Sequence, residues 1–401
     1  MMDGIQVALF AVLGMSEDEF LYHSEAQRNR DLIMIESNMQ AFLIGRQIVV
    51  TICTFLIARI TSISRTPEGE DNLFGVSDII QEILSTGILG AIVATTMASL
   101  VWRIIASSFP VMFLSNPVIH SLIRACILFE KRGIGSSSLI LARWHKFIAS
   151  YQHDEVYFRG ADEDTIVTTS EYEREIHLCL SFIKTTFSMG VLALSVAVVM
   201  AAIITNMTKA EEVGTLPVVI GLLFWFFIIW LAMLEGGQIS LVGLQPVLKT
   251  LYIDSHPITL KCTTLVHRGN TMEKFIAGRQ FLVGLVVFAL NYCTSPIDDY
   301  EGENVLGLPN WMNAIFYEYG GAAILTTVII GQLASQVIAA QCMIDFINTR
   351  FMLLTTYLSL AIEMSGILHA VYIIQLVFTK ISGKPIDSFE EEMVSGIFYF
   401  D

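Results

Sequence analysis

Long apolar segments alternate with short polar ones along most of the chain. Each has about 20 residues or more, which is the length that a helix needs to cross the hydrocarbon core of a bilayer. The predicted membrane helices cover residues 42–64, 83–107, 109–129, 178–206, 216–249, 275–295, 318–344 and 351–379. A shorter apolar stretch at 4–14 precedes them, and a polar segment at 130–177 divides them. The pattern predicts an all-α polytopic membrane protein, integral and multi-pass.

The composition agrees with a membrane protein. Of the 401 residues, 54% are hydrophobic and 15% are charged, and the mean hydropathy is +0.63. Soluble domains carry roughly 25% charged residues, and the apolar segments lack the strict alternation of a β-barrel. The net charge of −15 arises in the connecting segments and the tail, and no basic patch suggests nucleic acid. Without a nucleophile–base pair, a Cys/His cluster or a cofactor loop, the sequence predicts no enzyme, no metal site and no cofactor.

The chain contains an internal duplication. The tripeptide Gly45-Arg46-Gln47 recurs 233 positions later as Gly278-Arg279-Gln280. The same offset aligns Met39 with Met272, Phe42 with Phe275, Leu73 with Leu306, Gly87 with Gly320, and Glu130 with Glu363. An offset of 232 places Asp3-Gly4-Ile5-Gln6 over Glu235-Gly236-Gly237-Gln238. So many ungapped matches, loops included, indicate two copies of one unit.

The duplication predicts how the chain is divided. We expect a first repeat at 1–134, a polar connecting loop at 135–177, a second repeat at 178–379 and an acidic tail at 380–401. The second repeat holds five apolar segments, whereas the first lacks about one and a half helices at its N-terminus, as a truncated chain would. Because five crossings reverse the chain direction, we expect an inverted repeat of two five-helix units, as in many secondary transporters.

Polar side chains in lipid-buried helices are costly and usually mark a solute path. Glu235 and Gln238 are three positions apart and share a helix face, and Gly236-Gly237 permits close approach by a neighbouring backbone or a solute. With the donors and acceptors of Arg279 and Gln280, they suit a small hydroxyl-rich neutral solute. An alternative remains open, in which the glycines form a packing patch and Glu235 and Arg279 form a buried ion pair that fixes two helices.

The first copy offers a matching set of polar groups. Inversion predicts that its two motifs lie at the opposite side of the membrane from those of the second copy. Gln332 and Gln336 also share one helix face within 318–344, and their first-copy equivalents, Ser99 and Arg103, are polar. These glutamines either line a solute path or simply join helices, a role worth about 0.6 kcal/mol on average.

The two ordered motif pairs resemble those of the silicon (silicic acid) transporters of diatoms and related algae. That family is recognised by an EGxQ motif followed by a GRQ motif, each pair occurring twice in a ten-helix protein. Here the second pair is intact, and in the first pair Asp3 stands where the family has Glu. The resemblance covers the chain from Met1 to about residue 379.

The resemblance implies uptake of silicic acid coupled to sodium by alternating access, in the plasma membrane or the membrane of a silica-depositing compartment. The implied binding residues are Glu235, Gly236, Gly237, Gln238, Gly278, Arg279 and Gln280, with Asp3, Gly4, Gln6, Gly45, Arg46 and Gln47 in the first copy. Their carboxylates, amides and neighbouring carbonyls are the candidate sodium ligands. The expected partners are the solute and the lipid bilayer, and the sequence does not indicate an oligomeric state. A carrier or channel for boric acid or bicarbonate, and a non-transporting membrane scaffold, remain as alternatives.

Overall fold

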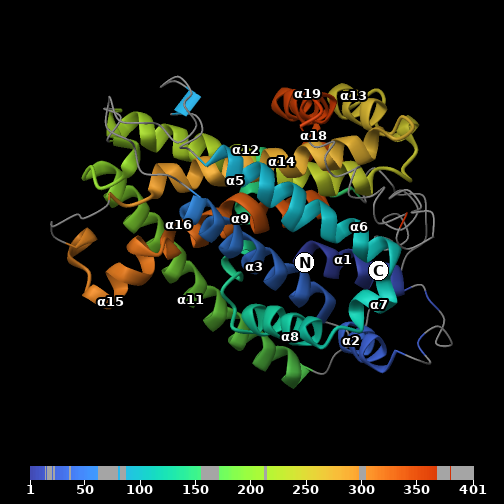
Figure 1. Cartoon of the computed structure of the whole chain (residues 1–401), viewed down its shortest axis with the longest axis horizontal. Helices are drawn as coiled ribbons and strands as arrows, with labels where there is room; N and C mark the ends of the chain where they lie inside the picture. Colours follow the sequence, from blue (N-terminus) through green and yellow to red (C-terminus); the bar gives the residue numbers. More distant parts are fainter. Residues whose placement is uncertain are drawn as a thin grey trace.

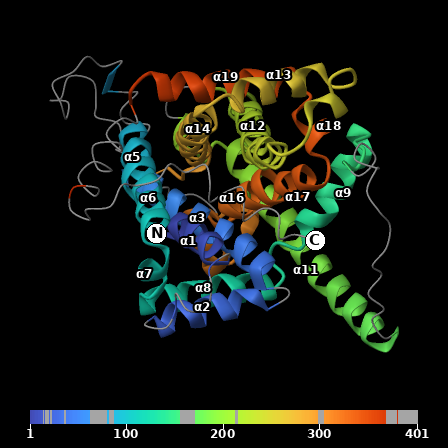
Figure 2. The same cartoon turned by 90° about the vertical axis from the view of Figure 1, so that its right-hand side faces the viewer.

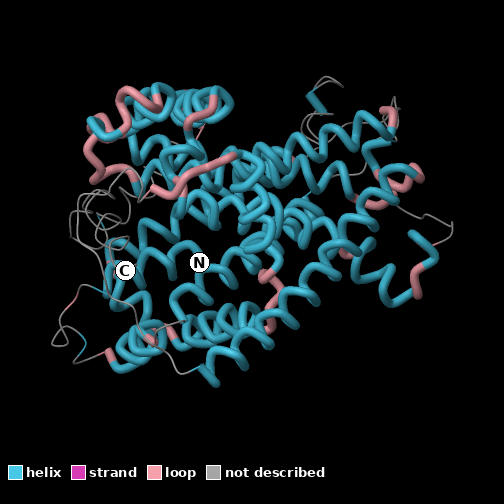
Figure 3. Tube along the Cα trace, turned by 180° about the vertical axis from the view of Figure 1, so that it is seen from behind, coloured by secondary structure: helices cyan, strands magenta, loops and turns pink. Residues whose placement is uncertain are grey.

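Helices make up the described part of a computed structural model of the chain (Figures 1 and 3). The structure describes residues 1–13, 15, 20, 23–35, 38–61, 80–81, 87–154, 171–211, 215–297, 304–367 and 380. The predicted acidic tail therefore lies almost wholly outside the described residues. The all-α prediction is confirmed.

Nine of the described elements precede α11: eight in the first repeat, including the π-helical segment η2, and one helix, α9, in the connector. They are α1 (Met2–Leu13), α2 (Ser24–Met34), α3 (Asn38–Thr61), α5 (Ile88–Val93), η2 (Ala94–Leu100), α6 (Val101–Ser108), α7 (Pro110–Leu114), α8 (Pro117–Lys131) and α9 (Ser137–Ala149).

The second half begins with the long helix α11 (Glu171–Ile204) and contains the π-helical segments η6 and η7. The elements that follow α11 are η3 (Lys209–Glu211), α12 (Pro217–Gly243), η4 (Lys249–Leu251), α13 (Pro257–Val266), α14 (Thr271–Thr294), η5 (Val305–Gly307), α15 (Asn310–Asn313), η6 (Ala314–Glu318), α16 (Gly321–Thr326), η7 (Thr327–Leu333), α17 (Ala334–Gln341), α18 (Met343–Ile347) and α19 (Arg350–Met364).

Helix bounds repeat along the chain at the offset found in the sequence. Moved by 233 positions, the bounds of α3, α5, η2, α6, α7 and α8 become those of α14, α16, η7, α17, α18 and α19. The turns repeat too: Gly87 and Gly320 precede matched helices with φ of 90° and 75°, a left-handed conformation that favours glycine. The duplication therefore extends from sequence to local backbone geometry.

Six helical stretches of the described residues are long and apolar enough to cross a membrane. They are Asn38–Thr61, Ile88–Ser108, Phe182–Ile204, Pro217–Gly243, Thr271–Thr294 and Gly321–Gln341. The stub predicted at 4–14 forms the short apolar helix α1. A chain with these helices is an integral, multi-pass membrane protein.

Two of the predicted membrane segments are shorter than expected. The run 109–129 is split into α7 and α8, because Pro110 and Pro117 each begin a new helix and disfavour helical geometry in the residue before them. The run 351–379 appears as α19, which ends at Met364, and residues 368–379 lie outside the described part. The number of crossings in each copy, and with it the inverted relation of the copies, stays a prediction.

Matched helices lie on opposite sides of the molecule. In both Figure 1 and Figure 2, α13 and α19 lie along the top edge, and their first-copy equivalents α2 and α8 lie along the bottom edge. Between them run the longer helices, with α3 packed against α14 and against η7. The polar connector predicted at 135–177 contains a helix, α9, which packs against α17 of the second copy.

Candidate functional site

The first-copy motifs form a buried ion pair. Asp3 of α1 and Arg46 of α3 lie 2.6 Å apart between Oδ1 and Nη1. Ser99, from the π-helical segment η2, donates a hydrogen bond of 2.5 Å to Oδ2 of Asp3. Arg46 also donates from Nη2 to the amide oxygen of Gln47 at 3.0 Å. The carboxylate of α1 is thereby held by groups from two other elements, α3 and η2.

The second-copy motifs form a corresponding pair. Arg279 of α14 lies 3.3 Å from Glu235 of α12, measured between Nη1 and Oε2. The same carboxylate oxygen accepts a hydrogen bond of 3.2 Å from the amide of Gln336. Arg279 donates to the amide oxygen of Gln280 at 3.0 Å, as Arg46 does to Gln47. The guanidinium additionally donates to the carbonyl of Leu234.

The glycines of the GRQ motifs let helices approach closely. A Cβ added at Gly45 would lie 1.9 Å from the carbonyl oxygen of Cys126, and one at Gly278 would lie 1.8 Å from that of Ser359. Ser359 is 233 positions after Cys126, so the two contacts are equivalent. Neither site tolerates a side chain without moving a backbone.

The glycines of the EGxQ motifs serve a similar role. A Cβ at Gly4 would meet the Trp102 carbonyl oxygen at 2.6 Å, and one at Gly236 would meet that of Ser335 at 3.0 Å. At Gly237 the added atom would meet the thioether of Met352. The packing-patch and ion-pair alternative thus describes the geometry of these residues correctly, and their role in binding a solute stays a proposal.

The two copies meet at the centre of the molecule. The hydroxyl of Thr51 in α3 donates a buried hydrogen bond of 2.6 Å to the amide oxygen of Gln332 in η7. Arg103 interacts electrostatically with both carboxylates and with both paired arginines. Arg103 thus lies within electrostatic range of both ion pairs, and the membrane side of each pair stays a prediction.

The glutamines of the motifs carry the amide groups with the fewest protein partners. Gln6 and Gln238 are half-buried, and the side-chain amide of neither is hydrogen-bonded to any described residue. Gln47 and Gln280 each accept a hydrogen bond from the adjacent arginine, which leaves their NH₂ groups as donors. All four can offer hydrogen bonds to a bound solute.

The carboxylates are poorly placed to bind a sodium ion. Each is paired with an arginine and interacts with Arg103, so a second cation there would be repelled. Within the described ranges, no group of three or more His, Cys, Asp or Glu side chains is arranged to hold a metal ion.

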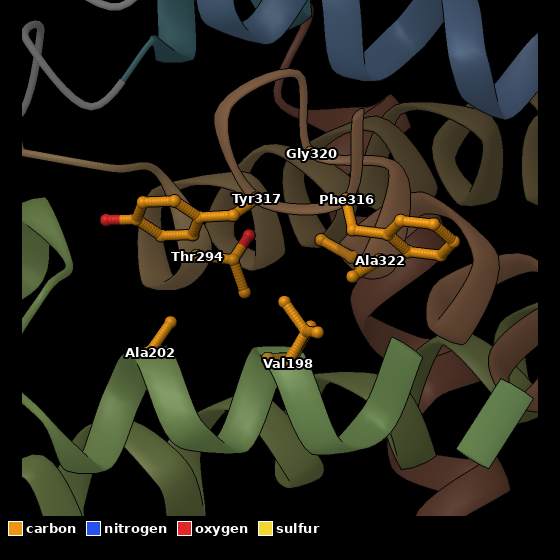
Figure 4. Close-up of a pocket in the computed structure, with 9 residues that line it drawn as sticks. Val198, Ala202, Thr294, Phe316, Tyr317, Gly320 and Ala322 are labelled. Carbon is orange, nitrogen blue, oxygen red and sulfur yellow. The ribbon is translucent and has the colours of Figure 1, made fainter. Parts of the chain in front are cut away.

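A small pocket lies away from these motifs. Figure 4 shows Val198 and Ala202 of α11 facing Phe316, Tyr317 and Thr294 across it. Thr294 is the last residue of α14, 15 positions from Arg279, which corresponds to about 22 Å along a helix. The lining is mostly apolar, so this pocket lacks the donors and acceptors that a hydroxyl-rich solute needs.

A separate polar cluster joins the connector to the second copy. Asp154 accepts hydrogen bonds from the backbone N–H groups of Met343 and Ile344 at 2.7 and 3.2 Å. Nearby, the carboxylate of Asp345 lies 2.8 Å from His256 Nε2. Burial raises the pKa of the Asp154 carboxyl to about 6, against the lowering effect of its two backbone hydrogen bonds.

Comparison with known proteins agrees with the motifs. The sequence profile of the silicon transporter family matches residues 1–179 and again residues 176–400. The chain belongs to the silicon transporter family. No curated protein and no solved structure shows significant similarity to the chain. The two matched regions together span nearly the whole chain, and both motif pairs fall within them.

Sequence reasoning missed the part that three residues play around the ion pairs. Ser99 and Arg103 were recognised only as polar equivalents of Gln332 and Gln336, and Thr51 was not singled out. A usable signal exists for two of them, since Arg103 is a cation within a membrane segment and Thr51 lies one helical turn after Gln47.

Proposed function

We propose that the protein takes up silicic acid across a membrane. The observation that carries the proposal is the pair of matched polar centres, one in each copy, inside an otherwise apolar helical bundle. Membership of the silicon transporter family supports silicic acid as the solute. Silicic acid is neutral and carries four hydroxyl groups, which both donate and accept hydrogen bonds. Amide side chains match these groups better than an isolated charge does.

We assign the solute contacts mainly to the glutamines. Gln6 and Gln238 have no hydrogen bond to a described residue, and Gln47 and Gln280 retain free NH₂ groups. The ion pairs hold the helices that carry these amides, and the glycines bring the helices close enough for a small solute to reach several of them. Gln332 and Gln336, from η7 and α17, complete the polar lining.

The transport mechanism that we propose is alternating access by two inverted repeats. Support comes from the matched helix bounds and from the opposite placement of α2 and α8 relative to α13 and α19 (Figure 2). In transporters of this kind, the solute site lies where the repeats meet. The Thr51–Gln332 hydrogen bond lies between the copies, so it would break or change when the two repeats rock.

We further propose that sodium drives uptake. Because arginines already occupy both carboxylates, the ion would take its oxygen ligands elsewhere, from backbone carbonyls and hydroxyl groups. Removing the sodium gradient from proteoliposomes that contain the purified protein should abolish concentrative uptake. Undiminished accumulation without sodium would contradict the coupling, and single-channel currents would favour a channel.

The site assignment is tested by Gln238→Ala and Gln280→Ala. Each change removes an amide without altering an ion pair, so we expect uptake of silicic acid to fall at least tenfold while the protein still reaches the membrane. Gln245→Ala is the matched control, because Gln245 is exposed just beyond the end of α12. Wild-type uptake by both site variants would overturn the assignment. Direct uptake measurements with boric acid and with bicarbonate would show whether another polar solute is transported.

A further inference from the structure

Arg103 carries a buried positive charge that its equivalent in the second copy lacks. It lies in α6 at the position that Gln336 occupies in α17, 233 residues later. Gln336 donates to the carboxylate of its own copy, Glu235, whereas Arg103 makes no hydrogen bond to Asp3. Ser99 takes that role in the first copy. Arg103 therefore does not make the hydrogen bond to a carboxylate that Gln336 makes in the second copy.

The charges around Arg103 do not balance. Its electrostatic neighbours among the described residues are Asp3, Glu235, Arg46 and Arg279. Each carboxylate is already paired with one of the other arginines, so Arg103 leaves one positive charge in excess. Only 8% of the surface of Arg103 is exposed. A buried charge without a partner of its own costs several kcal/mol, on the order of the penalty for breaking a buried ion pair.

The hydrogen-bonding groups are also unbalanced, in the same direction. Arg103 donates no hydrogen bond to a described residue, and its Nε is buried without a partner. The Nε atoms of Arg46 and Arg279 are likewise buried and unpartnered. The NH₂ groups of Gln47 and Gln280 add two more donors in the same motifs. Donors outnumber acceptors, which favours a ligand that mainly accepts hydrogen bonds.

We propose that this centre binds a small oxyanion of single charge, held by the guanidinium of Arg103. A guanidinium presents a planar fork of N–H donors that matches two oxygens of one anion. One negative charge neutralises the excess, and a compact anion fits a centre whose glycines hold the helices close together. This site goes beyond uptake of a neutral solute, because it predicts that an anion binds where the two copies meet.

Binding of bicarbonate to the purified full-length protein tests the proposal, since bicarbonate is mostly a monoanion at neutral pH and boric acid is mostly neutral. Bicarbonate should raise the melting temperature of the wild type in a saturable manner. Any effect of boric acid on the melting temperature should be the same in the wild type and in Arg103→Gln. Arg103→Gln, which copies the residue of the second repeat, should weaken bicarbonate binding at least tenfold, as expected for loss of charge-assisted hydrogen bonds.

Two further variants keep the test sharp. Arg103→Lys retains the charge and loses the fork, so we expect binding weaker than wild type and stronger than Arg103→Gln. Arg124→Gln removes an exposed arginine of α8 and should bind bicarbonate like wild type. No bicarbonate binding to the wild type, or equal binding by Arg103→Gln, would overturn the proposal.

The uptake measurement separates this inference from the proposed function. Bicarbonate should inhibit silicic acid uptake by the wild type and lose that inhibition in Arg103→Gln proteoliposomes. If the protein takes up no silicic acid but still binds bicarbonate through Arg103, the proposed function fails and the anion site stands. If uptake is normal and bicarbonate does not bind, the anion site fails alone.

Discussion

The two polar centres share a design and differ in their support. In the first copy, Asp3 lies 2.6 Å from its arginine and accepts from a serine, and Arg103 adds a further positive charge. In the second, Glu235 lies 3.3 Å from its arginine and accepts from an amide. A shorter acid in the first copy is matched by a closer ion pair and by more positive charge around it. Duplicated sites can therefore keep one architecture and diverge in charge.

The largest difference in stability between the two centres is expected when the carboxylate charge of each is removed in turn. Loss of one partner from a buried pair costs about 3–5 kcal/mol, because the other charge is left uncompensated. We expect Asp3→Asn to lower the thermal stability of the purified protein more than Glu235→Gln, since Arg46 loses its partner and Arg103 interacts more strongly with Asp3 than with Glu235. The reverse order of melting temperatures would show that Arg103 is neutralised by another group.

Adding a methyl group at the two GRQ glycines should affect both copies alike. Gly45→Ala and Gly278→Ala force an atom against a backbone carbonyl, and overpacking of this kind costs about 1–3 kcal/mol or more. Gly190→Ala in α11 is the control, because nothing lies within 4 Å of the added atom and alanine favours a helix. Melting temperatures of the three variants check this. Tolerance at one site only would show that the copies pack differently.

The pH dependence of stability should reveal the contact between the connector and the second copy, which Asp154 makes. The raised pKa of Asp154 means that the folded protein holds its proton more tightly than the unfolded chain does. Stability should therefore fall as the pH rises from 3.8 to about 6, and level off above that. Asp154→Asn should flatten this part of the curve, and Asp254→Asn, at an exposed position, should leave it unchanged. A wild-type curve that rises through this range would contradict the assignment.

The smallest expected effect concerns the hydrogen bond between the copies. Thr51→Val removes the donor to Gln332, and hydrogen bonds between membrane helices contribute about 0.6 kcal/mol on average. Thr54→Val is a suitable control, because the hydroxyl of Thr54 donates only within its own helix. We expect a slight loss of stability for Thr51→Val alone, together with a changed uptake rate. Equal stability and equal rates in both variants would remove this bond from the mechanism.

Much of the architecture could be predicted because its signals are local. Apolar length gave the membrane helices, and the repeated tripeptide gave the offset that later matched the helix bounds. The split of 109–129 was also local, since Pro110 and Pro117 mark it, but segment-scale hydropathy averages over such breaks. Hydropathy alone therefore predicted one helix over 109–129 where the chain forms α7 and α8.

The centre could not be predicted in the same way. An offset of 233 shows that Arg103 and Gln336 correspond, yet it contains no information on which carboxylate each one approaches. Which carboxylate each residue approaches depends on how the helices cross. The charged groups that interact with Arg103 therefore follow only from the tertiary structure. The pairing of Glu235 with Arg279 could be predicted as one of two alternatives, because a lone buried charge needs a partner.

The π-helical segments η2 and η7 occupy equivalent positions in the two copies. They cover Ala94–Leu100 and Thr327–Leu333, with the sequences ATTMASL and TVIIGQL, which share only the final leucine. Their wide turns have the same bounds under the offset, although almost every side chain has been replaced. The irregular turn therefore dates from the half-length ancestor that was duplicated. Backbone shape has been inherited here more faithfully than the amino acids that adopt it.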